Sequence, residues 1–360
     1  MDKNTEQSKR SRERLIKHYQ AYPSLLAQDV FKYAYQSAFG CEHLVSDAER
    51  ARQSILDEYA ALDEAGALLV EPLDGAYSRV HLASLGEGLT PETLAKLFCL
   101  SSKKEPNGLL ALEQTLAAAQ ALVLDGTIPL DGEDFANRLS NWRELGYPAM
   151  HHSDVFRKVY RPAYRVVANE YAKLLPIFAR IDKLLSEQGS AIVAIEGGSA
   201  SGKTTLAEIL SRVYDCNVFH TDDFFLRPEQ RSVERLAEVG GNLDRERFCD
   251  EILQALKKNE TVCYRPFDCA TQTLGEPILV KPKRLTVVEG VYSMHPAFGA
   301  YCDLSVFLDI APEYQRERIE NRNSPQLAKR FFTEWIPLEN EYFLKTDLKR
   351  QSDLVLLIEP

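Results

Sequence analysis

Residues 197–205 read Gly197-Gly198-Ser199-Ala200-Ser201-Gly202-Lys203-Thr204-Thr205, and this stretch decides the fold expected for the second half of the chain. It fits the pattern GxxxxGK[ST] and stands between a short apolar run, residues 191–195, and a helical pattern, which is the context that this motif requires. Glycines allow successive backbone N–H groups to point at phosphate oxygens, and the helix that begins at Lys203 adds its positive N-terminal end. The stretch therefore predicts a phosphate-binding loop, or P-loop; the alternative is a glycine- and serine-rich turn that binds nothing.

The loop also predicts which ligands it holds. Lys203 would reach the β- and γ-phosphates of a nucleotide, and the Thr204 hydroxyl would coordinate Mg²⁺. ATP and Mg²⁺ are therefore the expected cofactors. The residues expected to contact the nucleotide are Gly197, Gly198, Ser199, Ala200, Ser201, Gly202, Lys203, Thr204 and Thr205.

Short apolar runs recur after Gly189 at the lengths typical of buried strands. They lie at residues 191–195, 217–220, 285–288, 304–308 and 354–358. Helical patterns separate most of them, including residues 245–258 and 313–330. This alternation of strand and helix predicts an α/β domain whose sheet is mainly parallel and carries helices on both faces.

The first half of the chain has a mostly helical pattern. Helices are predicted at residues 24–38, from a capping box at 46–49, after Thr90-Pro91, at 109–124 and at 135–145, and only residues 77–85 indicate extended structure. A boundary between residues 180 and 189 then divides the chain into a mostly helical accessory domain, residues 1–185, and a P-loop domain, residues 186–360. A polar and aromatic cluster within residues 147–164 either binds an anionic ligand or only begins a helix.

Composition limits the classes of function. The 360 residues carry a formal net charge of −10, which argues against nucleic acid as the main partner. The seven cysteines form no CxxC pair and the N-terminus has no apolar signal segment, so a cytoplasmic location is expected. No apolar stretch reaches the roughly 18 residues of a membrane span, so no membrane partner is expected. Composition does not determine the oligomeric state.

Two carboxylates follow the second predicted strand, in the sequence His220-Thr221-Asp222-Asp223. They would lie beside the P-loop at the carboxyl edge of the sheet. A phosphoryl acceptor needs a base for its hydroxyl proton and Mg²⁺ needs oxygen ligands, so carboxylates suit both tasks. Continued strand geometry would point the two side chains to opposite sides, and either aspartate could instead cap a turn.

The motifs of the C-terminal half resemble those of the uridine kinase, phosphoribulokinase and nicotinamide riboside kinase family. Residues 197–205 look like its Walker A loop, and Asp222-Asp223-Phe224-Phe225 is similar to the DDFF of nicotinamide riboside kinases and the DSFY of uridine kinases. The resemblance covers roughly residue 190 to the C-terminus and implies that Asp222 is the catalytic base. It implies ATP-dependent phosphorylation of a hydroxyl on a small molecule, which would be a nucleoside or a related riboside or sugar-containing metabolite.

Further motifs in the family's order imply residues that bind the acceptor. Asn242-Leu243-Asp244 resembles the NFD segment whose Asp holds ribose hydroxyls, although Asp244 could also cap the following helix. Residues 264–268 resemble the P-x-Y-D segment that borders the acceptor pocket. This resemblance implies that Tyr264, Arg265 and Asp268 bind the acceptor. Phe267 departs from the family Tyr. Arg265 would suit an acidic or phosphorylated acceptor, unless it is only a solvated charge.

Residues 287–292 are similar to the family's VVEG Walker B strand, which places Glu289 at the end of a buried apolar run. An unpaired carboxylate there would be costly to desolvate. Mg²⁺ or its water shell would supply the partner, and a structural ion pair is the alternative.

A charged helix after residue 309 carries Arg316, Arg318, Arg322 and Arg330 at the position of the family's lid. Arg318 and Arg322 are four residues apart and share one helix face. Arginines on a closing lid can stabilise the charge of a transferring phosphoryl group, and Arg318 is the favoured candidate. A solvated helix face is the alternative.

Two other functions stand beside the kinase. The chain could be a nucleotide-dependent switch or sensor, or its helical domain could recruit the kinase to a protein partner. A small-molecule phosphoryl acceptor distinguishes the kinase from the switch or sensor. A kinase needs the acceptor for ATP turnover, whereas a sensor hydrolyses ATP without one.

Overall fold

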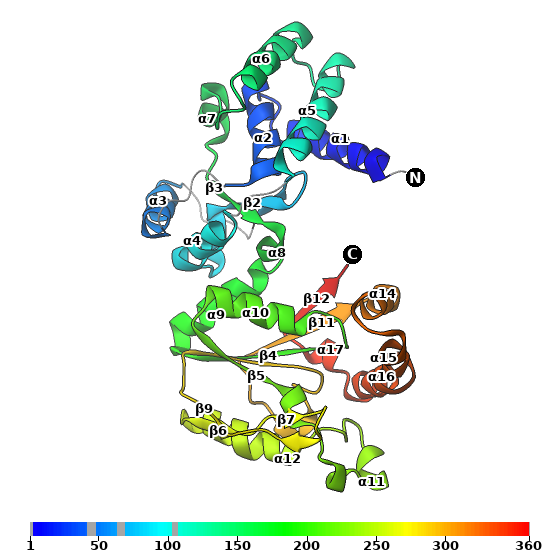
Figure 1. Ribbon diagram of the computed structural model, residues 1–360. Coiled ribbons are helices and arrows are strands. Elements are labelled where there is room, and N and C mark those ends of the chain that lie inside the picture. The colour runs from blue at the N-terminus through cyan, green and yellow to red at the C-terminus, as the bar shows by residue number, and fades with distance from the viewer. Residues whose placement is uncertain (1–2, 42–47, 63–68, 103–106, 360) are drawn as a thin grey trace. The chain divides into compact units, whose positions relative to one another are not determined.

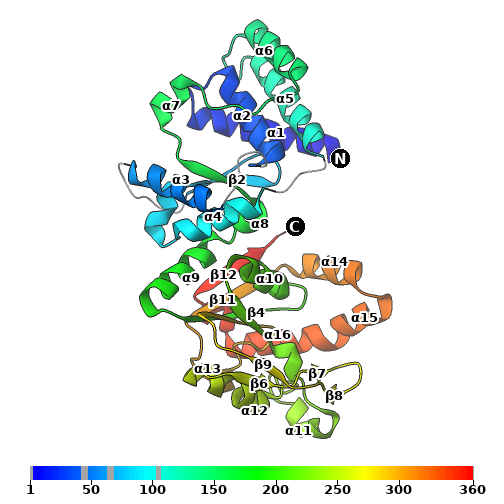
Figure 2. The same ribbon diagram turned by 60° about the vertical axis from the view of Figure 1, so that its left-hand side comes forward.

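The computed structural model describes residues 3–41, 48–62, 69–102 and 107–359, and the chain divides into two compact units, residues 1–182 and 183–360 (Figures 1 and 2). The division falls inside helix α9 (Leu175–Gln188), which also contains the predicted boundary at residue 185. Ser46 and Asp47 of the predicted capping box lie outside the described residues.

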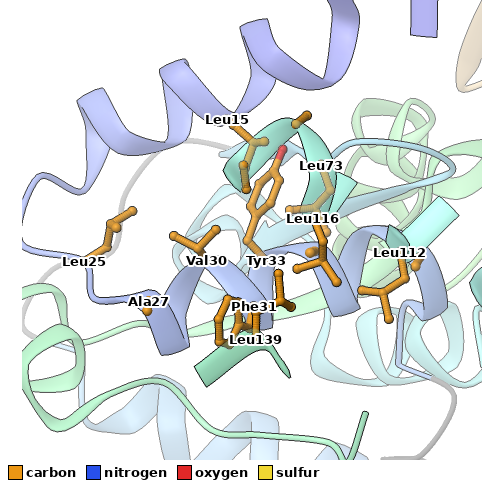
Figure 3. Close-up of a cluster of buried hydrophobic side chains, with 14 of the residues drawn as sticks. Leu15, Leu25, Ala27, Val30, Phe31, Tyr33, Leu73, Leu112, Leu116 and Leu139 are labelled. Carbon is orange, nitrogen blue, oxygen red and sulfur yellow. The ribbon is translucent and has the colours of Figure 1, made fainter. Parts of the chain in front are cut away.

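The first unit is built mainly from helices. They are α1 (Lys3–Ala21), α2 (Ala27–Phe39), α3 (Ala48–Ala60), α4 (Pro91–Leu100), α5 (Gly108–Leu124), α6 (Gly132–Glu144), α7 (Asp154–Tyr160) and α8 (Asn169–Ala172). Side chains of α1, α2 and α5 converge on one apolar core, where Tyr33 lies beside Leu15 and Leu116 (Figure 3). The predicted start of α4 is confirmed, because the Thr90 side chain accepts a hydrogen bond from the Thr93 backbone N–H.

A three-stranded antiparallel sheet completes the first unit, in the order β1 (Val70–Pro72), β2 (Tyr77–His81), β3 (Tyr164–Ala168). Only β2 lies in the region that the sequence indicated as extended. Strand β3 pairs with β2 across more than 80 residues of chain, with Val166 opposite Arg79. A local pattern could not reveal this pairing, because β3 follows directly on the polar and aromatic cluster.

The second unit contains a five-stranded parallel sheet in the order β12-β11-β4-β10-β5. Its strands are β4 (Ala191–Gly197), β5 (Cys216–His220), β10 (Leu285–Glu289), β11 (Leu304–Ile310) and β12 (Leu354–Ile358). All five lie where the apolar runs predicted them, and the α/β fold class is confirmed. Helix α10 (Lys203–Val213) covers one face, and α12 (Arg245–Phe248) and α16 (Ile336–Thr346) lie on the other side (Figures 1 and 2).

The two long helices predicted in this unit are interrupted. Residues 245–258 form α12, a π-helical segment over Cys249–Leu253 and then α13 (Gln254–Lys258). Residues 313–330 form α14 (Pro312–Arg322) and α15 (Pro325–Arg330), because Ser324 caps a new helix whose first residue is Pro325. The remaining elements are α11 (Val233–Leu236), α17 (Leu348–Gln351) and the paired short strands β6 (Val262–Tyr264) with β9 (Ile278–Val280) and β7 (Phe267–Asp268) with β8 (Thr273–Leu274).

Candidate functional site

The P-loop joins the end of β4 to the first turn of α10 and encloses a small cavity. The cavity has a volume of about 120 Å³ and is lined by Ala200, Gly202, Lys203, Thr204, Thr205, Arg318 and Arg322. Gly197 has φ +144°, and a Cβ there would lie 2.6 Å from the Leu308 carbonyl oxygen, so a side chain cannot be accommodated. The buried Ser201 hydroxyl has no hydrogen-bond partner among the described residues. A free hydroxyl in this loop is consistent with a site for an anionic ligand that would accept its hydrogen bond.

Lys203 is held against its own loop. Its Nζ donates a hydrogen bond of 3.0 Å to the Gly198 carbonyl oxygen, and the residue is only 9% exposed. A buried ammonium at the positive end of α10 concentrates cationic character where phosphates would lie.

The two predicted magnesium ligands are brought together. The Thr204 hydroxyl donates a 3.0 Å hydrogen bond to Glu289 Oε1, and Glu289 is 4% exposed at the end of β10. Hydroxyl and carboxylate oxygens are ligands that Mg²⁺ prefers, and Mg²⁺ is usually held by few protein groups together with phosphates and water. No cluster of three or more His, Cys, Asp or Glu side chains suited to a metal occurs within the described residues.

His220 is a third member of this group that the sequence analysis missed. Its Nδ1 lies 2.6 Å from the same Glu289 oxygen that Thr204 contacts. This hydrogen bond raises the pKa of His220 above its ordinary value, against the opposing effect of burial. His220 ends β5, so the parallel register that sets it opposite Glu289 positions it here.

Asp222 and Asp223 do not continue the extended geometry of β5. Residues Thr221–Phe224 form one turn of 3-10 helix. The expectation that alternating strand geometry separates the two side chains is therefore wrong, because it rests on a pleated backbone that ends at residue 220.

The surroundings of the two aspartates still differ. Desolvation raises the pKa of Asp222, the Lys203 charge opposes that effect and the Glu289 charge adds to it; the residue is nevertheless open to solvent. Burial also raises the pKa of Asp223, whose carboxylate is hydrogen-bonded to the Tyr264 hydroxyl. The charges of Lys203 and Glu289 thus affect the pKa of Asp222, whereas Asp223 has a hydrogen-bond partner in Tyr264.

Asp244 and Tyr264, two of the residues expected to bind the acceptor, lie beside this turn. Asp244 is 2% exposed, and its carboxylate caps α12 by accepting from the Arg247 backbone N–H and also accepts from Gln230 Nε2 at 2.9 Å. The capping role that the sequence left open is present. Tyr264 is 7% exposed and its pKa is raised to about 12 by burial.

Arg265 and Asp268, the other two, are engaged in their own turn. Arg265 is exposed, and its Nε donates to the Gly275 carbonyl oxygen at 2.7 Å. Asp268 is exposed as well and accepts from the Ala270 backbone N–H at 2.7 Å. Both side chains stabilise the loop that carries β7 and β8.

Arg247 is a buried cation that the sequence analysis did not single out. Its guanidinium lies 4.4 Å from the Phe224 ring centroid and donates to the Asp223 carbonyl oxygen at 2.5 Å. Nε lies 3.6 Å from Glu251 Oε1, yet neither Nε nor Nη1 makes a hydrogen bond within the described residues. Burial lowers its pKa. Donors left unsatisfied beside Asp223 suit an incoming acceptor with oxygen atoms.

The P-loop is hydrogen-bonded to α16. Glu339 accepts hydrogen bonds from the Ser199 backbone N–H at 2.8 Å and from its hydroxyl at 2.5 Å. Gln315 on α14 donates to the Ser199 carbonyl oxygen at 2.8 Å. Burial raises the pKa of Glu339, which is 5% exposed. The sequence analysis did not single out this carboxylate.

Glu196, the residue before the P-loop, is fully buried and was also missed. Its carboxylate accepts from the backbone N–H groups of Gly197, Tyr292 and Met294 at 3.0–3.1 Å and from the Tyr342 hydroxyl at 3.2 Å. Burial raises its pKa to about 7 in spite of these donors. Glu196 therefore ties together the start of the loop, the segment after β10 and α16.

The lid arginines separate into two groups. Arg318 and Arg322 line the P-loop cavity. Arg316 and Arg330 instead form exposed ion pairs with glutamates four residues further along the chain. The shared helix face predicted for Arg318 and Arg322 is the face that lines the cavity.

Part of the chain is similar in sequence to known proteins. A Schizosaccharomyces pombe protein named “Putative uridine kinase C227.14” is 26% identical over 188 residues, which cover 45% of this chain and 78% of that protein. The C-terminal half of the chain is distantly related to uridine kinases. A uridine kinase of Shewanella baltica is 27% identical over 139 residues, 35% of this chain and 65% of that kinase, so less than two thirds of the latter is spanned.

Two solved structures match about half of the chain at low TM-scores. A possible uridine kinase from Bacillus stearothermophilus has a TM-score of 0.38 and 21% identity, covering 50% of this chain and 99% of that one. A shikimate kinase from Bacteroides thetaiotaomicron has a TM-score of 0.27 and 16% identity, covering 46% and 86%. No family model matches the chain. Within the described residues, no helix is long and apolar enough to cross a bilayer.

Proposed function

We propose that residues 186–360 form a kinase domain that transfers the γ-phosphoryl group of ATP to a hydroxyl of a nucleoside or a related riboside, and that residues 1–185 form an accessory domain. The observation that carries the proposal is the 3.0 Å hydrogen bond from Thr204 of the P-loop to Glu289 at the end of β10, with Lys203 in the same loop and Asp222 in the turn that follows β5. A base, a phosphate-binding cation and a metal-binding carboxylate are the parts that phosphoryl transfer requires.

Each of these residues has a separate task. Thr204 and Glu289 would hold Mg²⁺, which when bound neutralises charge on the nucleotide phosphates. Lys203 would leave the Gly198 carbonyl oxygen and turn to the β- and γ-phosphates. Asp222 would orient the acceptor hydroxyl and take its proton. A pKa raised by burial makes Asp222 a better proton acceptor than an ordinary aspartate, while the Lys203 charge favours its ionised form.

Arg318 and Arg322 would contribute from the lid. Both already line the cavity beside the loop, so their guanidinium groups are placed to stabilise charge on the transferring group. Closure of the lid would exclude water, which strengthens these interactions and limits hydrolysis of ATP.

The acceptor would lie beside the turn of Asp222. The buried Asp244 carboxylate has lone pairs beyond the two hydrogen bonds that it accepts, so it is available for the vicinal hydroxyls of a ribose. Tyr264 would contribute a wall and Arg247 its unsatisfied donors. Arg265 and Asp268 would act by holding the loop at the edge of the pocket in shape.

Acceptor-dependent release of ADP tests this function. The full-length protein with MgATP is assayed against a panel of nucleosides, other ribosides, vitamins and sugar phosphates, with Lys203→Ala as the inactive control. We expect one riboside-containing compound to stimulate ADP release and to gain a phosphate detectable by mass spectrometry. Slow ADP release that no compound stimulates would instead indicate a nucleotide-dependent switch.

A further inference from the structure

The first unit contains a second cavity, with a volume of about 140 Å³. Its lining includes Tyr22, His81, Phe156, Tyr160, Arg161 and Tyr164. The volume is close to that of an apolar cavity of about 150 Å³ that admits one benzene ring. A single ring therefore fits, whereas a fused bicyclic ligand would extend beyond the cavity.

Aromatic side chains form much of the cavity wall. The ring centroids of Tyr22, Phe156 and Tyr160 lie 4.8–5.1 Å from one another. Tyr164 and His81 form a further pair at 6.1 Å. Aromatic rings prefer edge-to-face and offset-stacked partners at these separations, so an aromatic ligand continues the packing better than an aliphatic one.

Each tyrosine hydroxyl of this wall is held by a hydrogen bond. Tyr22 donates to Glu71 Oε2 at 3.0 Å, and Tyr160 accepts from the Ser24 backbone N–H at 2.7 Å. The Tyr164 hydroxyl lies 2.6 Å from His152 Nε2. The rings are therefore oriented before a ligand arrives, which reduces the entropic cost of binding.

The charge behind this wall is balanced. Arg79 is fully buried, pairs with Glu71 at 3.1 Å and places its guanidinium 4.7 Å from the Tyr164 ring centroid. Glu71 also lies 2.9 Å from His18 Nδ1. Because its carboxylate is satisfied from several sides, Glu71 does not select a cationic ligand.

The polar groups that line the cavity itself are hydrogen-bond donors. Arg161 ends α7 with φ +43° and has an exposed side chain. The His81 side chain is 25% exposed, and its Nε2 lies 3.8 Å from Glu71 Oε2. A guanidinium in the lining of a cavity favours a carboxylate or another anion. We propose that this cavity binds a single aromatic or heteroaromatic ring with an anionic substituent, the ring among Tyr22, Phe156, Tyr160 and Tyr164 and the anion at Arg161 and His81.

This site is independent of the proposed kinase function, because all of its residues belong to the first unit. Isothermal titration of the full-length protein uses benzoate and nicotinate as aromatic anions. Cyclohexanecarboxylate is the non-aromatic anion of matching size, and benzamide is the neutral aromatic. We expect saturable one-to-one binding of benzoate or nicotinate, and binding weaker by about tenfold for cyclohexanecarboxylate and for benzamide. Absence of saturable binding of both aromatic anions at millimolar concentration would overturn the proposal.

Two variants locate the binding. Arg161→Gln should weaken benzoate binding by about tenfold and leave benzamide unchanged, because only the anion loses its partner. Arg157→Gln is the matched control, since Arg157 lies on the same helix, is exposed, pairs with Asp154 and does not line the cavity. Equal effects of the two substitutions on benzoate would place the ligand elsewhere and refute the site. The comparison of benzoate with cyclohexanecarboxylate tests the aromatic wall without any change to the protein.

Discussion

The carboxylate of Glu339 accepts hydrogen bonds from both the backbone amide and the hydroxyl of Ser199, so that α16 holds the P-loop from 140 residues further along the chain. A π-helical segment, Phe331–Trp335, joins α15 to α16. A displacement of the lid helices α14 and α15 that reaches α16 would therefore be transmitted to the backbone of the loop.

Replacing this carboxylate tests the connection. In Glu339→Gln one of the two Ser199 donors faces an amide N–H₂, so we expect KM for ATP to rise several-fold and the free energy of unfolding to fall by about 1–2 kcal/mol. The control is Glu341→Gln on the same helix, which loses only an exposed pair with Lys345. Steady-state kinetics and urea unfolding check both, and identical behaviour of the two variants would contradict a role for Glu339.

The two aspartates after β5 should differ in their effect on catalysis. Asp222→Asn removes the proposed proton acceptor, so kcat should fall by about 10²–10⁴, while ATP affinity changes little. Asp223→Asn weakens the contact with Tyr264 and should mainly raise KM for the acceptor. Steady-state kinetics with the identified acceptor and a nucleotide titration separate the two effects. A nearly normal Asp222→Asn enzyme beside an inactive Asp223→Asn enzyme would reverse the assignment.

The lid arginines offer a matched comparison on one helix. Arg318→Ala should lower kcat by about 10²-fold, since it removes a donor that lines the P-loop cavity. Arg316→Ala should have little effect, because Arg316 pairs with Glu320 on the exposed face. We expect Arg322→Ala to fall between them. The order would be wrong if Arg316→Ala proved the most damaging of the three in a kcat assay.

Acid should destabilise the first unit through His152. Burial lowers the pKa of this 6% exposed side chain from 6.5 to about 4. Above pH 6.5 both folded and unfolded forms are neutral; between pH 6.5 and 4 the unfolded chain takes up a proton that the folded unit does not. The free energy of unfolding should therefore decrease by up to about 3 kcal/mol as pH falls through this window.

Histidine resonances measured by NMR against pH would check this value. One ring signal should titrate near pH 4 and disappear in His152→Gln, whereas His151→Gln, which changes the exposed neighbour, should remove a different signal. A signal assigned to His152 that titrates near 6.5 would contradict the expectation.

The parts of the fold that the sequence predicts are those encoded by contiguous residues. Strands β4 and β10 are apolar runs because both faces of the sheet are covered there, whereas the edge strand β12 leaves Val355 and Leu357 exposed. The P-loop is likewise contiguous, and the spacing of Arg318 and Arg322 follows from helix geometry. Residues 323–325 also carried a readable signal, since Asn323-Ser324-Pro325 marks the break between α14 and α15.

The parts that the sequence does not reveal depend on tertiary contacts. Strand β3 requires β2 as its partner, and nothing near Tyr164 indicates that pairing. Glu339 and Arg247 look like ordinary charges on helices until folding buries them beside Ser199 and Phe224. The 3-10 turn that contains Asp222 begins after β5 ends. The apolar pattern of the strand carries no information about the backbone conformation beyond its last residue.

The central position of β4 has a consequence for the order of events during synthesis. Both neighbours of β4, which are β10 and β11, come from residues 285–310, so the strand has two open edges until the ribosome has made most of the protein. The P-loop, residues 197–205, is translated before either of these neighbouring strands, and non-local pairing of this kind is intrinsically slow. A nascent chain that stops before Leu285 should therefore gain no protease resistance from ATP. Nucleotide should stabilise only chains that are long enough to include β10 and β11.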